Sequence, residues 1–400
     1  MRRHKFNKLI LILTIALIIM GLIIIYAIGP LRVNFMNMAY GSDYDTNYFF
    51  IHQLINVIVA LAMFILAFFV PYQQLRKYAK IILIAGLVLC ALLQLMALAN
   101  IPLAKCELGA CRWYNLGVTS FQPAELLKLG LVLYLAQLVA QRRKEGKLDT
   151  FDFWKPLGFY AGLSLFFVVV LQKDLGTGIV IIAIILAILL MSGLSWKRLA
   201  MAVGAIAVVG VLAVVSSPHR MERLMTYGQE GSSDSYHIDN AMLAIGTGGF
   251  FGVGPGNSVQ ATGYLPESIN DSVFAVMGET VGFVGLMAVV ACYTILLSQL
   301  LKVSDHLADL EQSLVVVGVF AWVAAHVVVN IGAMTGLIPL TGITLPLLSY
   351  GGTSMMFISF ALGASLQLSC YTSREVRKNE DTNSRRGVRG THYTGSSRRA

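Results

Sequence analysis

Long runs of apolar residues follow one another along almost the whole chain, and short polar segments separate them. Each run has roughly the 17–25 residues with which an α-helix crosses a bilayer. The pattern predicts ten spans, at residues 9–28, 51–70, 80–98, 121–140, 157–172, 174–192, 199–215, 273–300, 313–334 and 350–371. We therefore expect an all-α polytopic membrane protein with ten transmembrane helices.

These spans define the predicted organisation of the chain. Residues 1–8 precede a membrane domain over 9–371, whose largest loop, 216–272, joins the seventh and eighth spans. Residues 372–400 contain almost no apolar side chains, so we expect a disordered tail. Its arginines would attract anionic membrane lipid, although a plain solvated tail explains them equally well. No small-residue cleavage site follows the first span, so we expect that span to be retained.

Composition and charge agree with this class. The 400-residue chain is 56% hydrophobic and 13% charged, whereas about a quarter of a soluble domain is charged. Most of the 30 Lys and Arg residues lie in alternate polar segments, which predicts that both termini are cytoplasmic and that loop 216–272 faces out. The exceptions are Arg32, Lys105, Arg112, Lys128, Lys173, Arg220 and Arg223. Because this bias explains the net charge of +9, we expect no nucleic-acid partner.

Two of the five cysteines share one predicted outer loop. Cys106 and Cys111, in "KCELGACRW", are spaced for a small disulfide-closed loop, and two free thiols are the alternative. Cys90, Cys292 and Cys370 lie in or at the ends of spans, where cysteine behaves as a small hydrophobic residue. The sequence contains no spacing typical of a zinc site.

Charged side chains inside spans are costly and indicate function or specific pairing. Glu125 and Lys128, in "FQPAELLKLG", share a helical face. They either form an ion pair that locks two helices or line a polar cavity open to the outer side. Arg112, in the outer segment "CRWYNLG", indicates an anionic partner, because the charge bias disfavours a cation there.

Other polar residues have structural as well as functional explanations. In "LQKDLGTG", Lys173 and Asp174 are adjacent, and a self-paired turn explains them; Asp174 and Gln122 are also candidates for lining the cavity. His326 and Asn330 are four residues apart on one predicted helix, where hydrogen bonds to another helix suffice.

The outer loop 216–272 is rich in glycine and carries two arginines. Arg220 and Arg223 lie just outside the seventh span, in "SSPHRMERLMTYG". Residues 236–245 have helical character, and a glycine-dense run over 246–256 follows. That run matches neither a Walker loop nor a dinucleotide fingerprint. We expect its backbone to lie flat along a cavity or to re-enter the membrane where protein shields it.

A second irregular segment lies between the last two spans. Residues 330–356 interrupt apolar sequence with Pro339, Pro346 and paired glycines. Broken segments of this kind mark ligand sites that face a cavity. Ser349 and Tyr350 in this segment are therefore candidate substrate contacts.

Five motifs occur together and in order over residues 112–354. They are "RWYNLG" with "FQPAELLKL", "DLGTG", "AIGTGGFFGVGPGNS", "LPESINDSVFAVMGETVGFVG" and "NIGAMTGLIPLTGITLPLLSYGGTS". Together with the ten spans and the large seventh loop, they resemble the SEDS family of polytopic cell-wall glycosyltransferases, the FtsW, RodA and SpoVE proteins. The resemblance implies a SEDS-type fold without a soluble domain and the polymerisation of lipid II. It also matches Asp271 to the acid that the family requires.

The resemblance has consequences for subtype and partners. "HRMERL" looks most like the division-type members, which implies a place at the division septum of the cytoplasmic membrane. The family implies a class B penicillin-binding protein, a transpeptidase, and other division proteins as partners. "YHIDNAM" and "LPESINDSVF" depart from the family pattern, as does Lys173 where proline is usual. These departures leave the subtype open.

The implied reaction needs one base and several positive charges. The acceptor hydroxyl attacks the anomeric carbon of a donor that carries polyprenyl pyrophosphate, and a general base contributes about 10²–10⁴ in rate. Asp271 is the candidate base, and a helix cap is its alternative role. Cations, or a divalent metal ion, would stabilise the leaving pyrophosphate. The candidate substrate-binding set is Arg112, Glu125, Lys128, Arg220 and Arg223.

Glu279 lies about 12 Å further along the predicted helix, too far to share a proton with Asp271. We expect it to support the cavity, by pairing with a cation or by a hydrogen bond across helices.

Two other functions of the protein stay open. A lipid II flippase or other transporter would carry similar charges and broken helices, although the halves show no convincing inverted repeat. A non-catalytic division scaffold would not need Asp271.

Overall fold

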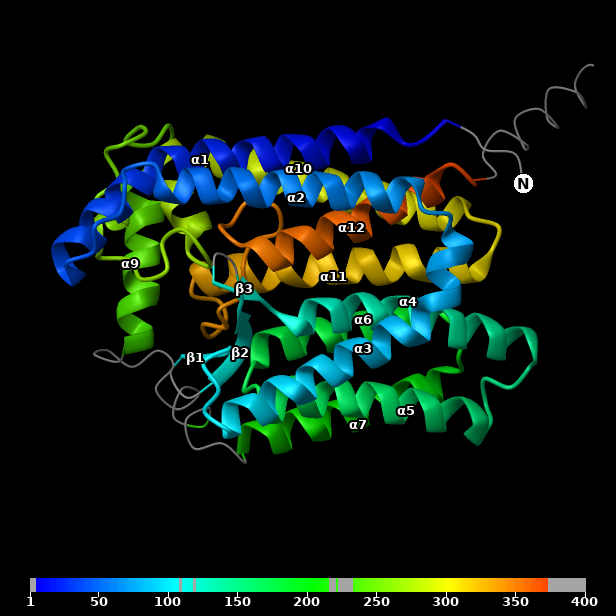
Figure 1. The fold of residues 1–400 in the computed structure, drawn as a ribbon. Coiled ribbons are helices and arrows are strands. Elements are labelled where there is room, and N and C mark those ends of the chain that lie inside the picture. The colour runs from blue at the N-terminus through cyan, green and yellow to red at the C-terminus, as the bar shows by residue number, and fades with distance from the viewer. Residues whose placement is uncertain (1–4, 108–109, 118–119, 216–220, 222–232, 373–400) are drawn as a thin grey trace, which may run out of the picture.

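The computed structural model describes residues 5–107, 110–117, 120–215, 221 and 233–372. Ten of its helices lie side by side with roughly aligned axes (Figure 1). They are α1 (Lys8–Tyr40), α2 (Tyr48–Phe69), α3 (Tyr72–Leu98), α4 (Pro123–Lys144), α5 (Phe151–Leu165), α6 (Leu175–Met191), α7 (Trp196–Val215), α10 (Val273–His306), α11 (Leu310–Met334) and α12 (Gly352–Ser369). Each predicted span overlaps one of these helices, so the all-α prediction is confirmed.

Seven of the described helices are long and apolar enough to cross a membrane by length and composition. They are α1, α2, α3, α4, α10, α11 and α5 together with its π-helical continuation η1 (Phe166–Leu171). The apolar helix α6 is shorter, at 17 residues. The chain is therefore an integral membrane protein, while the count of ten spans stays a prediction.

Of the seven membrane-length helices among the described residues, α4 and α11 are the most buried. In their most apolar windows 83% and 72% of the residues are buried, compared with 28% in α2 and α3. Polar side chains on α4 and α11 therefore lie in the middle of the bundle and away from lipid. This places the predicted polar residues of both helices inside the protein.

The outer segments contain regular structure that the predicted spans do not cover. The first span was predicted over residues 9–28, but α1 continues to Tyr40 with Pro30 inside it, and Gly41 ends it in the left-handed conformation with φ of 63°. The segment between α3 and α4 forms a small antiparallel sheet of β1 (Ala104–Glu107), β2 (Ala110–Asn115) and β3 (Ser120–Phe121). The sheet forms by backbone pairing across a short hairpin that a disulfide closes. Its strands are too short to show the alternation of apolar and polar residues that predicts a strand.

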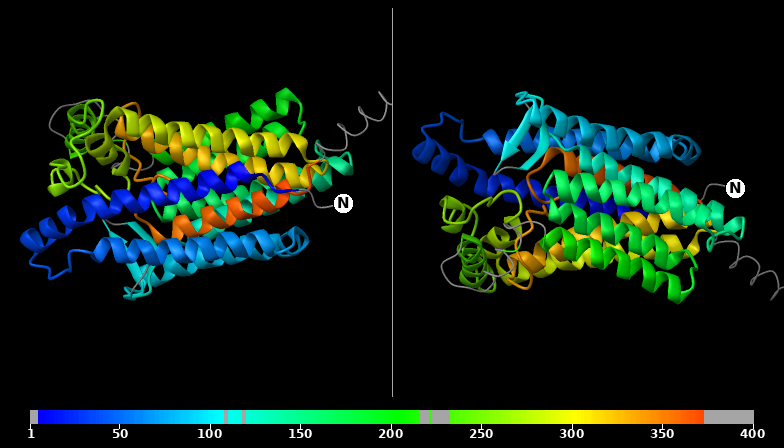
Figure 2. Two further views of the ribbon diagram at one scale, coloured as in Figure 1. Left: turned by 90° about the horizontal axis from the view of Figure 1, so that it is seen from above. Right: turned by 90° about the horizontal axis from the view of Figure 1, so that it is seen from below.

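The sheet, α9 (Ser233–Thr247) and the connection between α11 and α12 lie at one end of the bundle (Figures 1 and 2). Helix α1 begins at the other end. There the backbone N–H of Asn7 donates to Ser369 Oγ at 3.0 Å, so the two ends of the described chain meet. The predicted helical character of residues 236–245 is confirmed by α9. The end that carries α9 is called the outer end below.

Helix α10 is broken near its outer end. Gly282 has φ of 67° and ψ of −171°, which no α-helix contains. Four backbone hydrogen bonds of 2.8–3.1 Å join residues 249–254 of the glycine-rich loop to residues 279–284 at the break. The glycine-rich backbone therefore packs directly on the opened turn of α10. Its hydrogen bonds satisfy the amide and carbonyl groups that the break leaves without partners in the helix.

Replacing Gly252 with alanine is expected to destabilise the protein more than replacing Gly256. The two glycines have φ of 81° and 83°, so each alanine costs about 1–2 kcal/mol of backbone strain. A Cβ atom at residue 252 would also overlap the carbonyl oxygen of Thr280, adding about 1–3 kcal/mol, whereas residue 256 has open space. Thermal unfolding in detergent measures the difference. Equal melting temperatures for the two variants would show that the loop does not lie on α10 as described.

Candidate functional site

Asp271 lies at the outer end of the bundle, two residues before α10 begins. On α11, the side-chain amide of Asn330 donates to the backbone oxygen of Asp271 at 2.6 Å and to that of Ile343 at 2.7 Å. The backbone N–H of Tyr350 donates to Ile269 O at 2.8 Å. The segment that carries Asp271 is thus held by an inner helix and by the connection before α12.

The environment of the Asp271 carboxyl group favours its neutral form. Burial, followed by repulsion from the Glu267 carboxylate, raises the pKa of Asp271 from its usual 3.8 to about 7. Hydrogen bonds from the Asp271 and Ser272 amides and from the Ser272 hydroxyl oppose this rise. The residue keeps part of its surface exposed. An accessible carboxyl group with a pKa close to neutrality suits a general base.

The capping interpretation of Asp271 is wrong. The N-cap position of α10 is Ser272, and no side chain makes a capping hydrogen bond there. Asp271 lies one residue earlier, where its backbone oxygen is occupied by Asn330. Its carboxylate therefore does not cap the start of α10.

The loop before Asp271 has a fixed shape. Glu267 has a left-handed backbone with φ of 48°, and its carboxylate accepts a hydrogen bond from the Asn270 side chain. The backbone oxygen of Glu267 accepts from Asn270 N at 3.0 Å and from Ser272 N at 3.2 Å. This compact turn holds the Glu267 carboxylate near Asp271.

Glu279 organises the glycine-rich loop. Its buried carboxylate accepts hydrogen bonds from Ser258 Oγ at 2.5 Å and from the backbone N–H groups of Val259 and Gln260, the former at 2.8 Å. The two expected kinds of partner were a cation or a group on another helix. The structure instead gives it hydroxyl and amide donors from the loop.

Glu125 and Lys128 form a buried ion pair within α4. Lys128 Nζ lies 2.9 Å from Glu125 Oε1, 3.0 Å from His326 Nε2 on α11 and 5.0 Å from the Trp322 ring centroid. Nδ1 of His326 lies 3.1 Å from Thr344 O, so a neutral histidine donates there and accepts from Lys128. The pair thus connects α4 to α11 and to the connection before α12, which supports the interpretation of a lock between helices.

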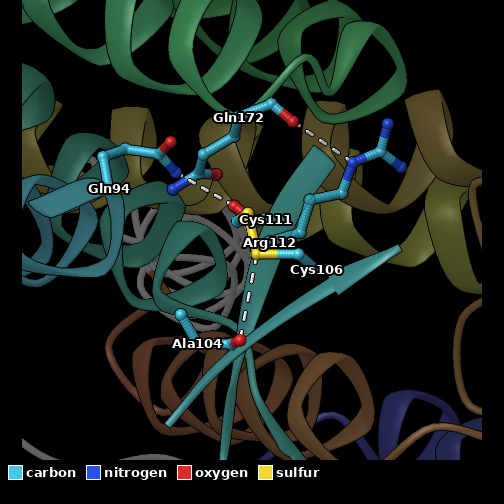
Figure 3. Close-up of a disulfide and its surroundings, with 6 residues drawn as sticks. All are labelled: Gln94, Ala104, Cys106, Cys111, Arg112 and Gln172. Carbon is cyan, nitrogen blue, oxygen red and sulfur yellow. Dashed lines mark hydrogen bonds between the residues drawn. A yellow bond between two sulfur atoms is a disulfide. The ribbon is translucent and has the colours of Figure 1, made fainter. Parts of the chain in front are cut away.

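Among the described residues, Arg112 binds backbone carbonyl groups. Its Nε donates to Gln172 O at 3.3 Å (Figure 3). Its Nη2 donates to Lys173 O at 2.8 Å. Cys106 and Cys111, opposite each other on β1 and β2, are joined by a disulfide. The hairpin therefore holds Arg112 on the carbonyl end of η1. These two carbonyl oxygens bind one side of the guanidinium group, and the expected anionic partner of Arg112 stays a prediction.

Asp174 is the N-cap of α6 and pairs with Gln122. It accepts from Thr177 N at 3.0 Å, from Thr177 Oγ1 at 2.9 Å and from Gln122 Nε2 at 3.3 Å. The expectation that Lys173 and Asp174 pair with each other was wrong, because helix capping uses the carboxylate. Ser349 is likewise used internally, since its hydroxyl accepts from Leu345 N at 2.8 Å.

Some predicted residues cannot be placed, and two others were missed. Arg220 and Arg223 lie outside the described residues, as does most of the basic tail. Among the residues that are described, no three His, Cys, Asp or Glu side chains group as metal ligands would, so no metal site is assigned. Sequence reasoning missed the contact of His237 Nε2 with Ser272 Oγ, at 2.6 Å. The only signal was that both residues lie in stretches that depart from the family pattern.

Comparisons with known proteins agree with this fold. The family model for the cell cycle proteins FtsW, RodA and SpoVE matches residues 7–374. The chain is 32% identical to stage V sporulation protein E of Bacillus subtilis (strain 168), over 92% of this chain and 97% of that protein. It is also 32% identical to a probable peptidoglycan glycosyltransferase FtsW of Nitrosomonas europaea, over 90% and 92%.

Solved structures share the fold. A chain from a study of how a peptidoglycan synthase complex coordinates polymerization and crosslinking superposes with a TM-score of 0.71 at 25% identity, covering 91% of this chain and 97% of that one. RodA of Thermus thermophilus superposes with a TM-score of 0.64 over 91% and 96%. This chain belongs to the FtsW/RodA/SpoVE family of cell cycle proteins, the SEDS family.

Proposed function

We propose that this protein is a peptidoglycan glycosyltransferase that polymerises lipid II at the outer face of the cytoplasmic membrane. The observation that carries the proposal is the Asp271 carboxyl group at the outer end, with its pKa near 7. Relatives named as probable peptidoglycan glycosyltransferases support the reaction class.

In the proposed reaction, Asp271 takes the proton of the acceptor sugar hydroxyl. The hydroxyl oxygen forms a bond to the anomeric carbon of the donor as the bond from that carbon to the pyrophosphate oxygen breaks. The polyprenyl pyrophosphate leaves with the electron pair as an anion, so it needs positive charge and no proton. Arg112 and Lys128 already bind protein groups. The sequence also offers Arg220 and Arg223 as candidates, and a divalent cation is the alternative.

Orientation, partner and cellular place belong to the same proposal. Both termini face the cytoplasm, as the Lys and Arg distribution predicts. The proposed partner is a class B penicillin-binding protein, because the structural relative comes from a complex that couples polymerization to crosslinking. The many relatives named FtsW favour a role in division at the septum.

The test supplies labelled lipid II to the purified protein, alone and with its transpeptidase partner, and separates the products on a gel. Glycan polymer supports the proposal. Absence of polymer under both conditions, together with transfer of lipid II across vesicle membranes by this protein, would identify a transporter instead. Absence of both activities would leave a scaffold.

Replacing Glu267 with glutamine is expected to extend activity toward acid pH. Repulsion from the Glu267 carboxylate raises the pKa of Asp271, and a base works only when ionised. Removing that charge lowers the pKa, so more Asp271 is ionised at pH 5–6 and the acid limb of the rate profile moves down. Glu267→Asp keeps the charge and serves as the matched control. An unchanged profile in Glu267→Gln would contradict the assigned repulsion.

A further inference from the structure

A line of hydrogen-bonding groups leads from Asp271 toward α9. Ser272 Oγ lies 3.4 Å from Asp271 Oδ1 and 2.6 Å from His237 Nε2. Ser272 is fully buried, whereas His237 keeps part of its surface exposed. The three groups therefore run from the interior of the site to the solvent at the outer end.

The Ser272 side chain does not serve as a helix cap. A serine at an N-cap normally accepts a hydrogen bond from an amide of the first turn, but the Ser272 side chain makes no such bond. Its hydroxyl lies 2.9 Å from Pro266 O. A hydroxyl has one hydrogen and two lone pairs. Rotation about the Cβ–Oγ bond can thus direct its hydrogen to Pro266 O, to Asp271 or to His237 Nε2.

The proposed reaction creates a need for such a line. Each glycosidic bond leaves one proton on the Asp271 carboxyl group, and the next cycle requires the carboxylate. The Asp271 carboxyl group is partly exposed, and a bound substrate would cover that exposed side, so a route through the protein can return the proton to solvent. A neutral histidine can accept a proton close to neutral pH. Ser272 is the group that connects the two.

We propose that Ser272 and His237 are positioning residues that carry the proton from Asp271 to the outer solution. The inference rests on the proposed function. Ser272 Oγ takes the proton from Asp271 and gives its own hydrogen to His237 Nε2. Asp271 becomes a carboxylate again, Ser272 stays neutral and His237 becomes an imidazolium. The imidazolium then loses a proton to water, so each turn moves one proton from the acceptor hydroxyl to solvent.

Other titratable groups lie on the elements that carry or adjoin this line. They are Tyr236 and Asp239 on α9, Tyr264 and Glu267 in the loop before Asp271, Glu279 on α10, His326 on α11 and Tyr350 before α12. Asp239 is exposed, where salt and water screen its charge. Glu279 and His326 are hydrogen-bonded to other partners. Glu267 is thus the main charge that affects Asp271, and Glu267→Gln tests it separately.

The relay predicts a specific behaviour of His237→Ala. In the polymerisation assay, kcat is expected to fall by roughly ten- to a hundredfold, because acid–base assistance contributes about 10²–10⁴ in full. KM for lipid II should stay the same. Added imidazole should restore the rate of His237→Ala in a concentration-dependent way and leave the parent unaffected. His306→Ala, at the far end of α10, is the matched control and should behave like the parent.

Ser272→Ala breaks the line at its middle. It should lower kcat as His237→Ala does, and the double variant should be no slower than the slower single variant, because residues of one unit are not additive. Should Ser272→Ala fail to fold, the partly exposed His237 provides the decisive variant. A His237→Ala protein with parental kcat, or with a loss that imidazole does not restore, would overturn the relay.

Failure of the relay and failure of the proposed function are distinguishable. An inactive Asp271→Asn with a fully active His237→Ala overturns only the relay. A parental rate in Asp271→Asn overturns the proposed base and, with it, the need for a relay.

Discussion

Asp271→Asn is expected to lower the rate of glycan polymerisation by about 10²–10⁴, the contribution of a general base. Asparagine has nearly the same shape and leaves the backbone oxygen available to Asn330, so the segment before α10 should keep its position. It cannot accept the proton of the acceptor hydroxyl. The loss should therefore appear in kcat, with little change in KM or melting temperature.

A neighbouring acid provides the control for this variant. Glu267 lies four residues earlier in the same loop, and Glu267→Gln should retain polymerisation at neutral pH. The comparison separates loss of a base from loss of any negative charge near the site. Undiminished polymer from Asp271→Asn would remove Asp271 from the role of base.

Lys128→Met is expected to destabilise the protein by about 3–5 kcal/mol, as measured by thermal or denaturant unfolding in detergent. Lys128 and Glu125 are both almost completely buried in the centre of the bundle. Removing the lysine leaves the Glu125 carboxylate without a compensating charge, which is the costly way to break a buried pair. It also leaves His326 Nε2 without its donor.

Two variants make the comparison quantitative. The double variant Glu125→Gln/Lys128→Met removes both charges and should recover much of the loss, since a neutral buried pair avoids the desolvated charge. Arg142 and Glu145, also three residues apart at the end of α4 and partly exposed, form a matched surface pair. Arg142→Met should cost at most about 1 kcal/mol. Similar losses for Lys128→Met and Arg142→Met would show that the inner pair is not buried.

The bundle was predictable because apolar length alone reports a membrane helix. The place of each helix in the bundle was harder to predict, because the apolar pattern does not distinguish α4, which other helices enclose, from α3 at the periphery. The extent of α1 was missed because Pro30 and the polar residues after it resemble a helix end, while the outer part of α1 packs its Phe35 against Gly263 of the loop before Asp271. Contacts of that kind are distant in sequence.

The site was predictable only in part, and for a similar reason. Motif order located Asp271, and helical spacing placed Glu125 next to Lys128. The partners of Arg112 and Glu279 are backbone groups, which every residue carries and no side-chain pattern identifies. Ser272 and His237 are 35 residues apart, and only the fold of α9 over the outer end brings them together.

The break in α10 divides that helix into two mechanical parts. The short part from Val273 to the break continues directly from Asp271, and the glycine-rich loop is hydrogen-bonded to both sides of the break. The long part, beyond the break, is continuous with the bundle. Because the loop is bonded to both sides of the break, it fixes the angle between the two parts. The position of the acid relative to the bundle therefore depends on the loop as well as on the helix that carries it.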